Sequence, residues 1–181
     1  CIKRPYQDEY DRLEQLEISF EEINRFCKLC KSVGLEPMVT CFSRDHVLEL
    51  SQLGFDTIKV ASYDCASFQM LRELKDKYRH IIVSTGATFD YEIEHAASVL
   101  DGVQFSFLHC VTVYPTPLEQ LNLARMDYLR RFTPRVGFSD HSLVSSDGVI
   151  ASKAALALGA KIIERHYTVL GPEVTKDGPV S

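Results

Sequence analysis

Short apolar runs alternate with helical patterns along most of this chain, and this alternation constrains the fold more than any other feature. The runs begin near residues 37, 57, 81, 103, 135 and 161. They are continuously apolar rather than alternating, which is typical of strands covered on both faces, as in a parallel sheet. Strict strand–helix alternation with short connections predicts an α/β fold, either a barrel or a doubly wound sheet.

The predicted elements follow one order along the chain. Ser19 and Glu22 form a capping box that begins a helix, and Gly34 ends it. Residues 1–18 show no clear period and are predicted to be a surface connection, so the helix and six β/α units occupy 19–181. The predicted strands are 37–42, 57–62, 81–84, 103–113, 135–138 and 161–167, and the later helices are 44–53, 67–78, 91–100, 118–131 and 149–158.

Polar residues after the strands distinguish the two architectures. The sequence has neither the GxGxxG turn of a Rossmann sheet nor a P-loop. Polar residues instead follow nearly every strand, and convergence on one rim is the layout of a (β/α)8 TIM barrel active site. Such barrels need about 250 residues, so we expect that the first two β/α units are missing and precede Cys1. The rim residues are Thr40, Ser62, Ser84, Thr85, Thr112, Tyr114, Ser139, Asp140, His141 and His166.

Composition excludes several classes of protein. The 181 residues carry 20 Lys and Arg against 25 Asp and Glu, a net charge of −5, which argues against a nucleic-acid or polybasic membrane partner. No apolar run is long enough to span a bilayer, and no secretory signal opens the chain. The cysteines lie mostly in apolar strands, and the single CxxC, at Cys27 and Cys30, lacks a second pair. Reduced thiols and a cytoplasmic location are therefore predicted.

Two of the six histidines are candidate metal ligands. His46, His80 and His95 lie in polar segments and are predicted to be solvated, and His109 lies inside an apolar strand as a hydrogen-bonded core residue. His141 and His166 each follow one of two consecutive strands, so their imidazoles could share a metal ion. The alternative is two hydrogen-bonded histidines at the rim, and spacing alone does not separate these interpretations.

Five motifs in register resemble the sialic acid synthase (N-acetylneuraminate synthase) family. The resemblance covers about residues 19–181 and implies a barrel that condenses phosphoenolpyruvate with an N-acetylated amino sugar, typically N-acetylmannosamine, to give a nine-carbon sialic acid. The motifs are Lys59-Val60-Ala61-Ser62, Ser84-Thr85-Gly86, the run from Leu108 to Pro117, Gly137 to Ser142, and Ala157 to Ala160 with Ile163 to Thr168.

The resemblance also implies roles for individual residues. His141 and His166 would bind manganese or magnesium, which activates the sugar aldehyde. Lys59 would bind the phosphoenolpyruvate anion, although a buried lysine can also pair with Asp64 or another interior acid. The other residues implied to contact substrate are Thr40, Ser62, Ser84, Thr112, Tyr114, Ser139 and Asp177.

Three of the implied positions need comment. Thr112 departs from the asparagine common in the family and cannot both donate and accept as an amide does. Asp177 lies where relatives have an acidic residue near the sugar, in a different local pattern. Asp140 and Arg165 flank the histidines and are predicted to orient ligands and anions.

The resemblance leaves alternatives open. The family's first two strands carry a catalytic glutamate and a lysine with no counterpart here, and its C-terminal antifreeze-like domain is also absent. The full-length family protein is expected to be a homodimer. The acceptor sugar could be of the sialic, legionaminic or pseudaminic type, and the chain could instead be a metal-dependent aldolase or hydrolase, or an inactive fragment.

Overall fold

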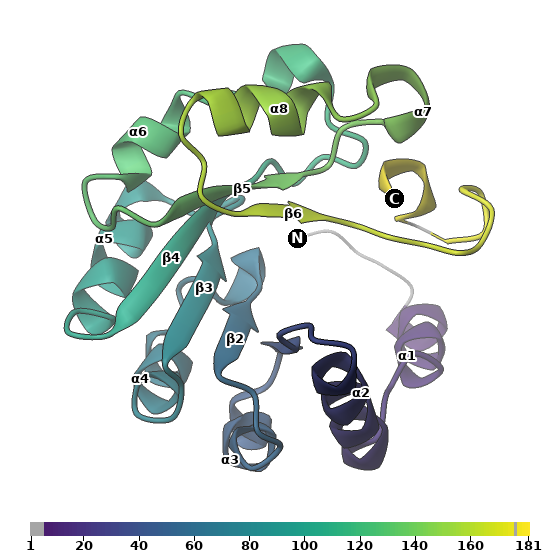
Figure 1. Cartoon of the computed structure of the whole chain (residues 1–181), viewed down its shortest axis with the longest axis vertical. Coiled ribbons are helices and arrows are strands. Elements are labelled where there is room, and N and C mark those ends of the chain that lie inside the picture. Colours follow the sequence, from purple (N-terminus) through teal and green to yellow (C-terminus); the bar gives the residue numbers. More distant parts are fainter. Residues whose placement is uncertain (1–5, 176) are drawn as a thin grey trace.

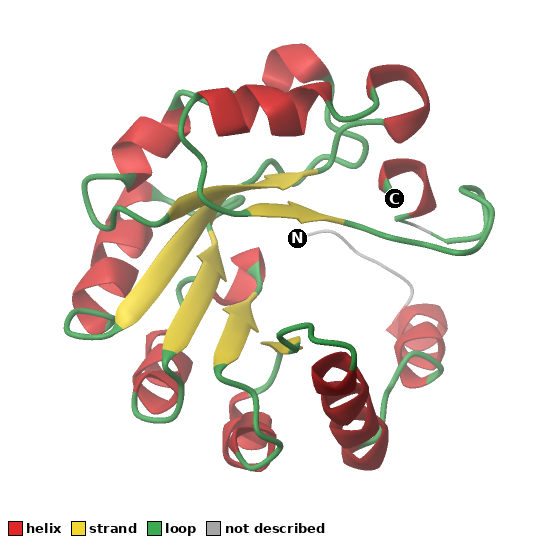
Figure 2. Ribbon diagram, viewed as in Figure 1, coloured by secondary structure: helices red, strands yellow, loops and turns green. Residues whose placement is uncertain are grey.

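Six parallel strands form one sheet in the computed structural model, which describes residues 6–175 and 177–181 (Figure 1). The strands pair in sequence order, β1-β2-β3-β4-β5-β6, and helices lie along the convex side of the sheet (Figure 2). The strands are β1 (Met38–Cys41), β2 (Thr57–Val60), β3 (His80–Ser84), β4 (Gln104–His109), β5 (Val136–Asp140) and β6 (Ile163–Arg165). The α-helices are α1 (Tyr6–Glu14), α2 (Phe20–Ser32), α3 (Val47–Ser51), α4 (Phe68–Lys75), α5 (Asp90–Val99), α6 (Arg125–Leu129), α7 (Val144–Asp147) and α8 (Ile150–Ala157).

The two faces of the sheet have different chemistry. Side chains that point toward the helices form the hydrophobic core, with Ile58, Ile81 and Phe107 fully buried among helix residues. Because side chains alternate along a strand, the intervening residues point to the concave face. Lys59 and Ser106 are such residues, and both are buried. The face toward the helices therefore carries most of the apolar core, whereas the concave face includes buried polar residues.

The sheet is strongly curled, as a contact between distant strands shows. β2 and β6 are not neighbours in the sheet, yet the Nζ atom of Lys59 lies 3.0 Å from an Oε atom of Glu164. In the part of the chain that the structure describes, no strand pairs with the outer edge of β1 or β6. The fold is thus an open six-stranded parallel half-barrel. This confirms the α/β class, and the structure does not show the predicted eight-stranded barrel closed.

The helices agree with the sequence except in three places, one of which is the short helix α7, where no helix was predicted. The capping box of α2 is present, since Ser19 accepts from the Glu22 amide and Glu22 accepts from the Ser19 amide. The segment 1–18, predicted to be a connection without regular structure, contains α1; residues 1–5 lie outside the described part. The predicted helix 118–131 is wrong in its first half, because Asn122 has a positive φ of 45° and only a short 3-10 turn precedes it.

Other predictions concern cysteine, histidine and membrane segments. The described cysteines are all reduced. His109 is a buried core residue whose Nε2 lies 2.7 Å from the Leu121 carbonyl, as expected. His80 was wrongly predicted to be solvated, because it is half-buried and its Nε2 bonds Ser106 Oγ at 2.8 Å. Within the described residues, no helix has the length and apolar character needed to cross a membrane.

Candidate active site

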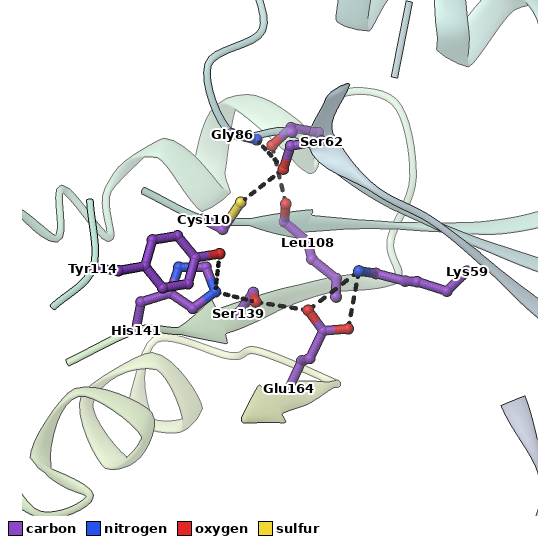
Figure 3. A network of polar contacts seen from close by, with 10 residues as sticks. Lys59, Ser62, Gly86, Leu108, Cys110, Tyr114, Ser139, His141 and Glu164 are labelled. Carbon is purple, nitrogen blue, oxygen red and sulfur yellow. Dashed lines mark hydrogen bonds and ion pairs between the residues drawn. The ribbon is translucent and has the colours of Figure 1, made fainter. Parts of the chain in front are cut away.

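A buried ion pair links two distant strands on the concave face. Lys59 of β2 is only 6% exposed, and its Nζ lies 3.0 and 3.2 Å from the two carboxylate oxygens of Glu164 on β6. Ser139 of β5 donates to the same carboxylate over 2.7 Å (Figure 3). Lys59 therefore pairs with an interior acid, as one interpretation of the sequence allowed, but this acid is Glu164 rather than Asp64.

His141 is held in one orientation at the end of β5. Its Nδ1 lies 2.9 Å from the Val111 carbonyl oxygen, which can only accept, so Nδ1 carries the proton. Burial lowers the pKa of His141, which favours the neutral ring. The Nε2 lone pair then faces the concave side, 3.0 Å from the Tyr114 hydroxyl and 3.2 Å from Ser139 Oγ (Figure 3). The tether to Val111 thus leaves Nε2 as the atom available for a ligand.

His166 lies beside His141, as predicted. The two ring centroids are 5.3 Å apart, and Tyr114 stacks on His141 with its centroid at 4.0 Å. The Nδ1 of His166 is 3.4 Å from the carboxylate of Asp177, which brings that predicted sugar-binding residue to the same place. Tyr114 and Asp177 therefore join the histidine pair.

The pairing of β5 with β6 explains why these side chains meet. Asp140 is paired with Arg165 in the register, and Ser139 with Glu164. Ser139 and Glu164 come directly before Asp140 and Arg165 and point to the concave face. His141 and His166 come directly after them and lie on the same face, whereas Asp140 and Arg165 point to the convex side. Arg165 Nη1 donates to Asp140 over 2.6 Å behind the sheet. This ion pair on the convex side connects β5 to β6, the two strands that precede His141 and His166.

Asp140 is a fully buried carboxylate with many hydrogen bonds. It accepts from the amide and hydroxyl of Ser142 and from Ser152. Burial alone would raise the pKa of Asp140, but these hydrogen bonds and the Arg165 guanidinium outweigh burial and lower it below the ordinary value. Asp140 is thus an ionised structural carboxylate next to His141.

A second polar group lies at the ends of β2, β3 and β4. Ser62 Oγ accepts from the Gly86 amide over 3.1 Å and lies 3.1 Å from Cys110 Sγ (Figure 3). Burial raises the pKa of the Cys110 thiol, which keeps it protonated at neutral pH. A cavity of about 140 Å³ is lined by Ser62, Gly86 and Thr112, among others. These hydroxyl and amide groups are suited to hold the oxygens of a small anion.

The remaining predicted residues lie on the same face with fewer contacts. Thr40 is paired with Lys59 in the β1–β2 register, so the two side chains lie on one face of the sheet. Ser84 ends β3 and is 3% exposed. The structure brings Lys59, Ser139, His141 and Tyr114 into one network, while Ser62 and Thr112 line the neighbouring cavity.

Glu164 is the residue of this site to which sequence reasoning assigned no role. It joins Lys59 to Ser139 and thus forms the centre of the network. A signal was present, because Glu164 lies in the last strand, two residues before His166 and therefore on the same face. What the sequence could not show is that β6 curls back to reach β2.

A buried lysine and two adjacent histidines lie at or near the carboxyl ends of parallel strands in a curled sheet, which is the layout of the α/β-barrel class of proteins. The model of the NeuB family matches residues 2–181, and the chain belongs to this family.

Curated relatives and a solved structure agree with this assignment. The N,N'-diacetyllegionaminic acid synthase of Campylobacter jejuni is 32% identical over 181 residues, covering 92% of this chain and 53% of the relative. The N-acetylneuraminate-9-phosphate synthase of Drosophila melanogaster is 30% identical, covering 86% and 42%. The crystal structure of N-acetylneuraminic acid synthetase from Leptospira borgpetersenii in complex with citrate superposes with a TM-score of 0.84 at 29% identity, covering 91% and 57%. The chain spans about half the length of the curated relatives it matches.

Proposed function

We propose that this chain is part of a synthase that condenses phosphoenolpyruvate with an N-acetylated hexose to form a nonulosonic acid. N-acetylmannosamine or a related sugar is the acceptor. The methylene carbon of phosphoenolpyruvate bonds to the aldehyde carbon of the sugar, water supplies an oxygen, and phosphate leaves. The observation that carries the proposal is the single network of Lys59, Ser139 and His141 on the concave face of a NeuB-family sheet.

Phosphoenolpyruvate is proposed to bind across β1 to β5. A buried ammonium is costly unless an anion meets it. Lys59 is a buried cation on the concave face, and without substrate the Glu164 carboxylate is the anion that meets it. Thr40, Ser62 and Ser84 supply hydroxyl groups near the carboxyl ends of β1, β2 and β3, which suit the oxygens of a phosphate and a carboxylate. The Ser139 hydroxyl, which donates to Glu164, belongs to the same proposed site.

The histidine pair fits a divalent ion such as Mn²⁺ or Mg²⁺. The Val111 tether leaves the Nε2 lone pair of His141 available, and the ring of His166 is adjacent. Among the described residues no group of three or more His, Cys, Asp or Glu side chains is placed to hold an ion. The proposed site therefore has two protein ligands and leaves positions for substrate. When bound, the ion would polarise the sugar carbonyl.

The acceptor sugar is proposed to lie between the histidines and the C-terminal segment. The Asp177 carboxylate, which lies 3.4 Å from His166 Nδ1, would accept hydrogen bonds from sugar hydroxyls there, and Tyr114 would form a wall of the sugar site. Thr112, which lines the neighbouring cavity, has one hydroxyl where relatives present an amide, and so forms fewer hydrogen bonds. The same motifs serve sialic, legionaminic and pseudaminic acid synthases, so the substituents of the hexose are left open.

The test uses the complete protein, with whatever its gene encodes on either side of these residues. Purified protein is incubated with phosphoenolpyruvate, Mn²⁺ and a panel of N-acetylated hexoses, and products are identified by mass spectrometry and phosphate release. A nine-carbon acid from at least one hexose is expected. Consumption of phosphoenolpyruvate without a hexose, or cleavage of a nonulosonic acid without phosphoenolpyruvate, would instead indicate a hydrolase or an aldolase. Two further proposals have their own tests: a homodimer by light scattering of the same preparation, and a cytoplasmic location by fractionation of cells that produce the protein.

A further inference from the structure

Glu164 occupies the position at which an anion would meet Lys59. Both carboxylate oxygens lie within 3.2 Å of the Lys59 ammonium, and the Lys59 side chain is only 8% exposed. An ammonium has three donors and carries one positive charge. An anionic substrate that reaches Lys59 must therefore share that charge with Glu164 or take it over.

Glu164 has an alternative partner in the same network. Ser139 donates to its Oε1 atom over 2.7 Å, and Ser139 also lies 3.2 Å from His141 Nε2. The side chain of Glu164 is 29% exposed, so water reaches it. The carboxylate can thus leave Lys59 and stay hydrogen-bonded, which makes exchange of partners feasible.

We propose that Glu164 is an internal competitor of phosphoenolpyruvate for Lys59, and so sets the affinity of the site for its anion. This inference rests on the proposed function. In the absence of an anion the carboxylate satisfies a buried lysine that would otherwise be costly. When phosphoenolpyruvate binds, Lys59 exchanges the carboxylate for the substrate, and Glu164 keeps the hydrogen bond that it already accepts from Ser139.

Competition and mere positioning predict opposite results for Glu164→Gln. If the carboxylate competes, its removal leaves Lys59 without an opposing charge, so the Kd for phosphoenolpyruvate decreases by on the order of tenfold. If Glu164 only positions Lys59, removal loosens the lysine and the Kd increases. The substitution preserves side-chain shape, so the difference reports on charge.

The experiment is isothermal titration of the complete protein with phosphoenolpyruvate. The variants are Glu164→Gln, Lys59→Met, the double variant, and Glu36→Gln as a matched control. Glu36 contacts Thr57 at the opposite end of β2 from the site, over 2.7 Å. Glu36→Gln removes one negative charge and is expected to leave the Kd unchanged.

The double variant separates direct competition from a general electrostatic effect. If Glu164 acts through Lys59, the gain from Glu164→Gln disappears in the Lys59→Met background. Thermal unfolding gives a second readout, because Glu164→Gln should lower Tm without ligand and increase the rise in Tm that phosphoenolpyruvate produces.

The possible outcomes distinguish failure of the proposed function from failure of the proposed competition by Glu164. No binding of phosphoenolpyruvate by the folded wild-type protein refutes the proposed function. Binding by the wild type with an unchanged or higher Kd in Glu164→Gln refutes only the competition. The competition is also refuted if Glu164→Gln increases the affinity for phosphoenolpyruvate in the Lys59→Met background, or if Glu36→Gln increases the affinity by the same amount.

Discussion

Gly86 shows at residue scale how closely the cavity beside Ser62 and Thr112 is packed. A Cβ atom at this position would lie 2.6 Å from Cys110 Sγ, 2.7 Å from Thr112 Cγ2 and 3.0 Å from Ser62 Oγ. Such separations are too short for ordinary contacts, so a side chain here must displace its neighbours. The Gly86 amide also donates to Ser62, and displacement would move that hydroxyl.

We therefore expect Gly86→Ala to weaken phosphoenolpyruvate binding and to destabilise the protein by about 1–3 kcal/mol. Titration and urea unfolding of the complete protein measure the two effects. Gly102→Ala is the comparison, because Gly102 has φ +86° but no atom within 4 Å of its would-be Cβ. It should cost roughly 1–2 kcal/mol of backbone strain and leave binding unchanged. Equal loss of binding in both variants would show that the cavity does not hold the anion.

At the scale of elements, the Asp140–Arg165 ion pair joins β5 to β6. Asp140 is fully buried, so its removal leaves a guanidinium that is mostly buried without its partner. Loss of one member of a buried pair typically costs about 3–5 kcal/mol. Because β5 and β6 present His141 and His166, this pair supports the histidine geometry from behind the sheet.

The lowered pKa of Asp140 makes part of this stability dependent on pH. A carboxylate whose pKa is lower in the folded than in the unfolded state stabilises fully above the unfolded value of about 3.9, and the effect is lost as the pH falls further. Urea unfolding of the wild type should thus show a decrease in stability below about pH 4 that is smaller in Asp140→Asn. Asp101→Asn, which changes an exposed carboxylate, should retain the wild-type pH profile. If Asp140→Asn does not fold, Ser152→Ala, which removes one hydrogen bond, gives the same comparison at a cost of about 1 kcal/mol.

Elements were predictable from sequence where one local signal determined them. The strand at 57 and the capped helix at Ser19 were predicted because continuous β-branched runs and capping boxes act locally. The helix α1 was missed although Tyr6, Tyr10 and Leu13 have helical spacing, because charged residues dominate the segment. The helix predicted over 118–131 was wrong because Asn122 adopts a left-handed conformation that periodicity does not reveal.

Within the site, contacts between residues of adjacent strands were predictable from sequence, and contacts that depend on the curvature of the sheet were not. His141 and His166 could be placed together because they follow adjacent parallel strands. The partner of Lys59 could not be predicted, since Glu164 lies 105 residues away and meets it only through the curl of the sheet. Contacts between strands that are not neighbours depend on curvature, which a single sequence does not encode locally.

At the scale of the whole molecule, the open half-barrel limits what these 181 residues can do alone. The described strands leave β1 and β6 unpaired on their outer sides. By its resemblance to the family, the proposed reaction also needs a glutamate and a second cation from two further strands. Loss of one charge-stabilising contact in such a site costs about 3–4 kcal/mol, which is on the order of a hundred- to a thousand-fold in rate.

We therefore expect that the 181 residues alone form no nine-carbon acid from phosphoenolpyruvate and N-acetylmannosamine, whichever metal is added. Joined to the two further β/α units that the resemblance to the family implies, the chain should be active on its acceptor sugar and should lose activity on His141→Ala or His166→Ala. His95→Ala, which changes an exposed histidine stacked on Phe68, serves as the control and should retain activity. Product formation by the 181 residues alone, measured by mass spectrometry, would show that the catalytic groups lie within them.

The sequential order of the strands has a consequence for how the chain acquires its structure during synthesis. Each strand pairs only with the strand made immediately before or after it, so each β/α unit can add to a growing sheet as the chain emerges from the ribosome. The contact between Lys59 and Glu164 is an exception, because it spans most of the chain. A nascent chain that ends before β6 lacks Glu164, the carboxylate that pairs with Lys59 in the folded protein. The charged network is therefore assembled last, when the strand that carries both Glu164 and the neighbouring Arg165 joins β5.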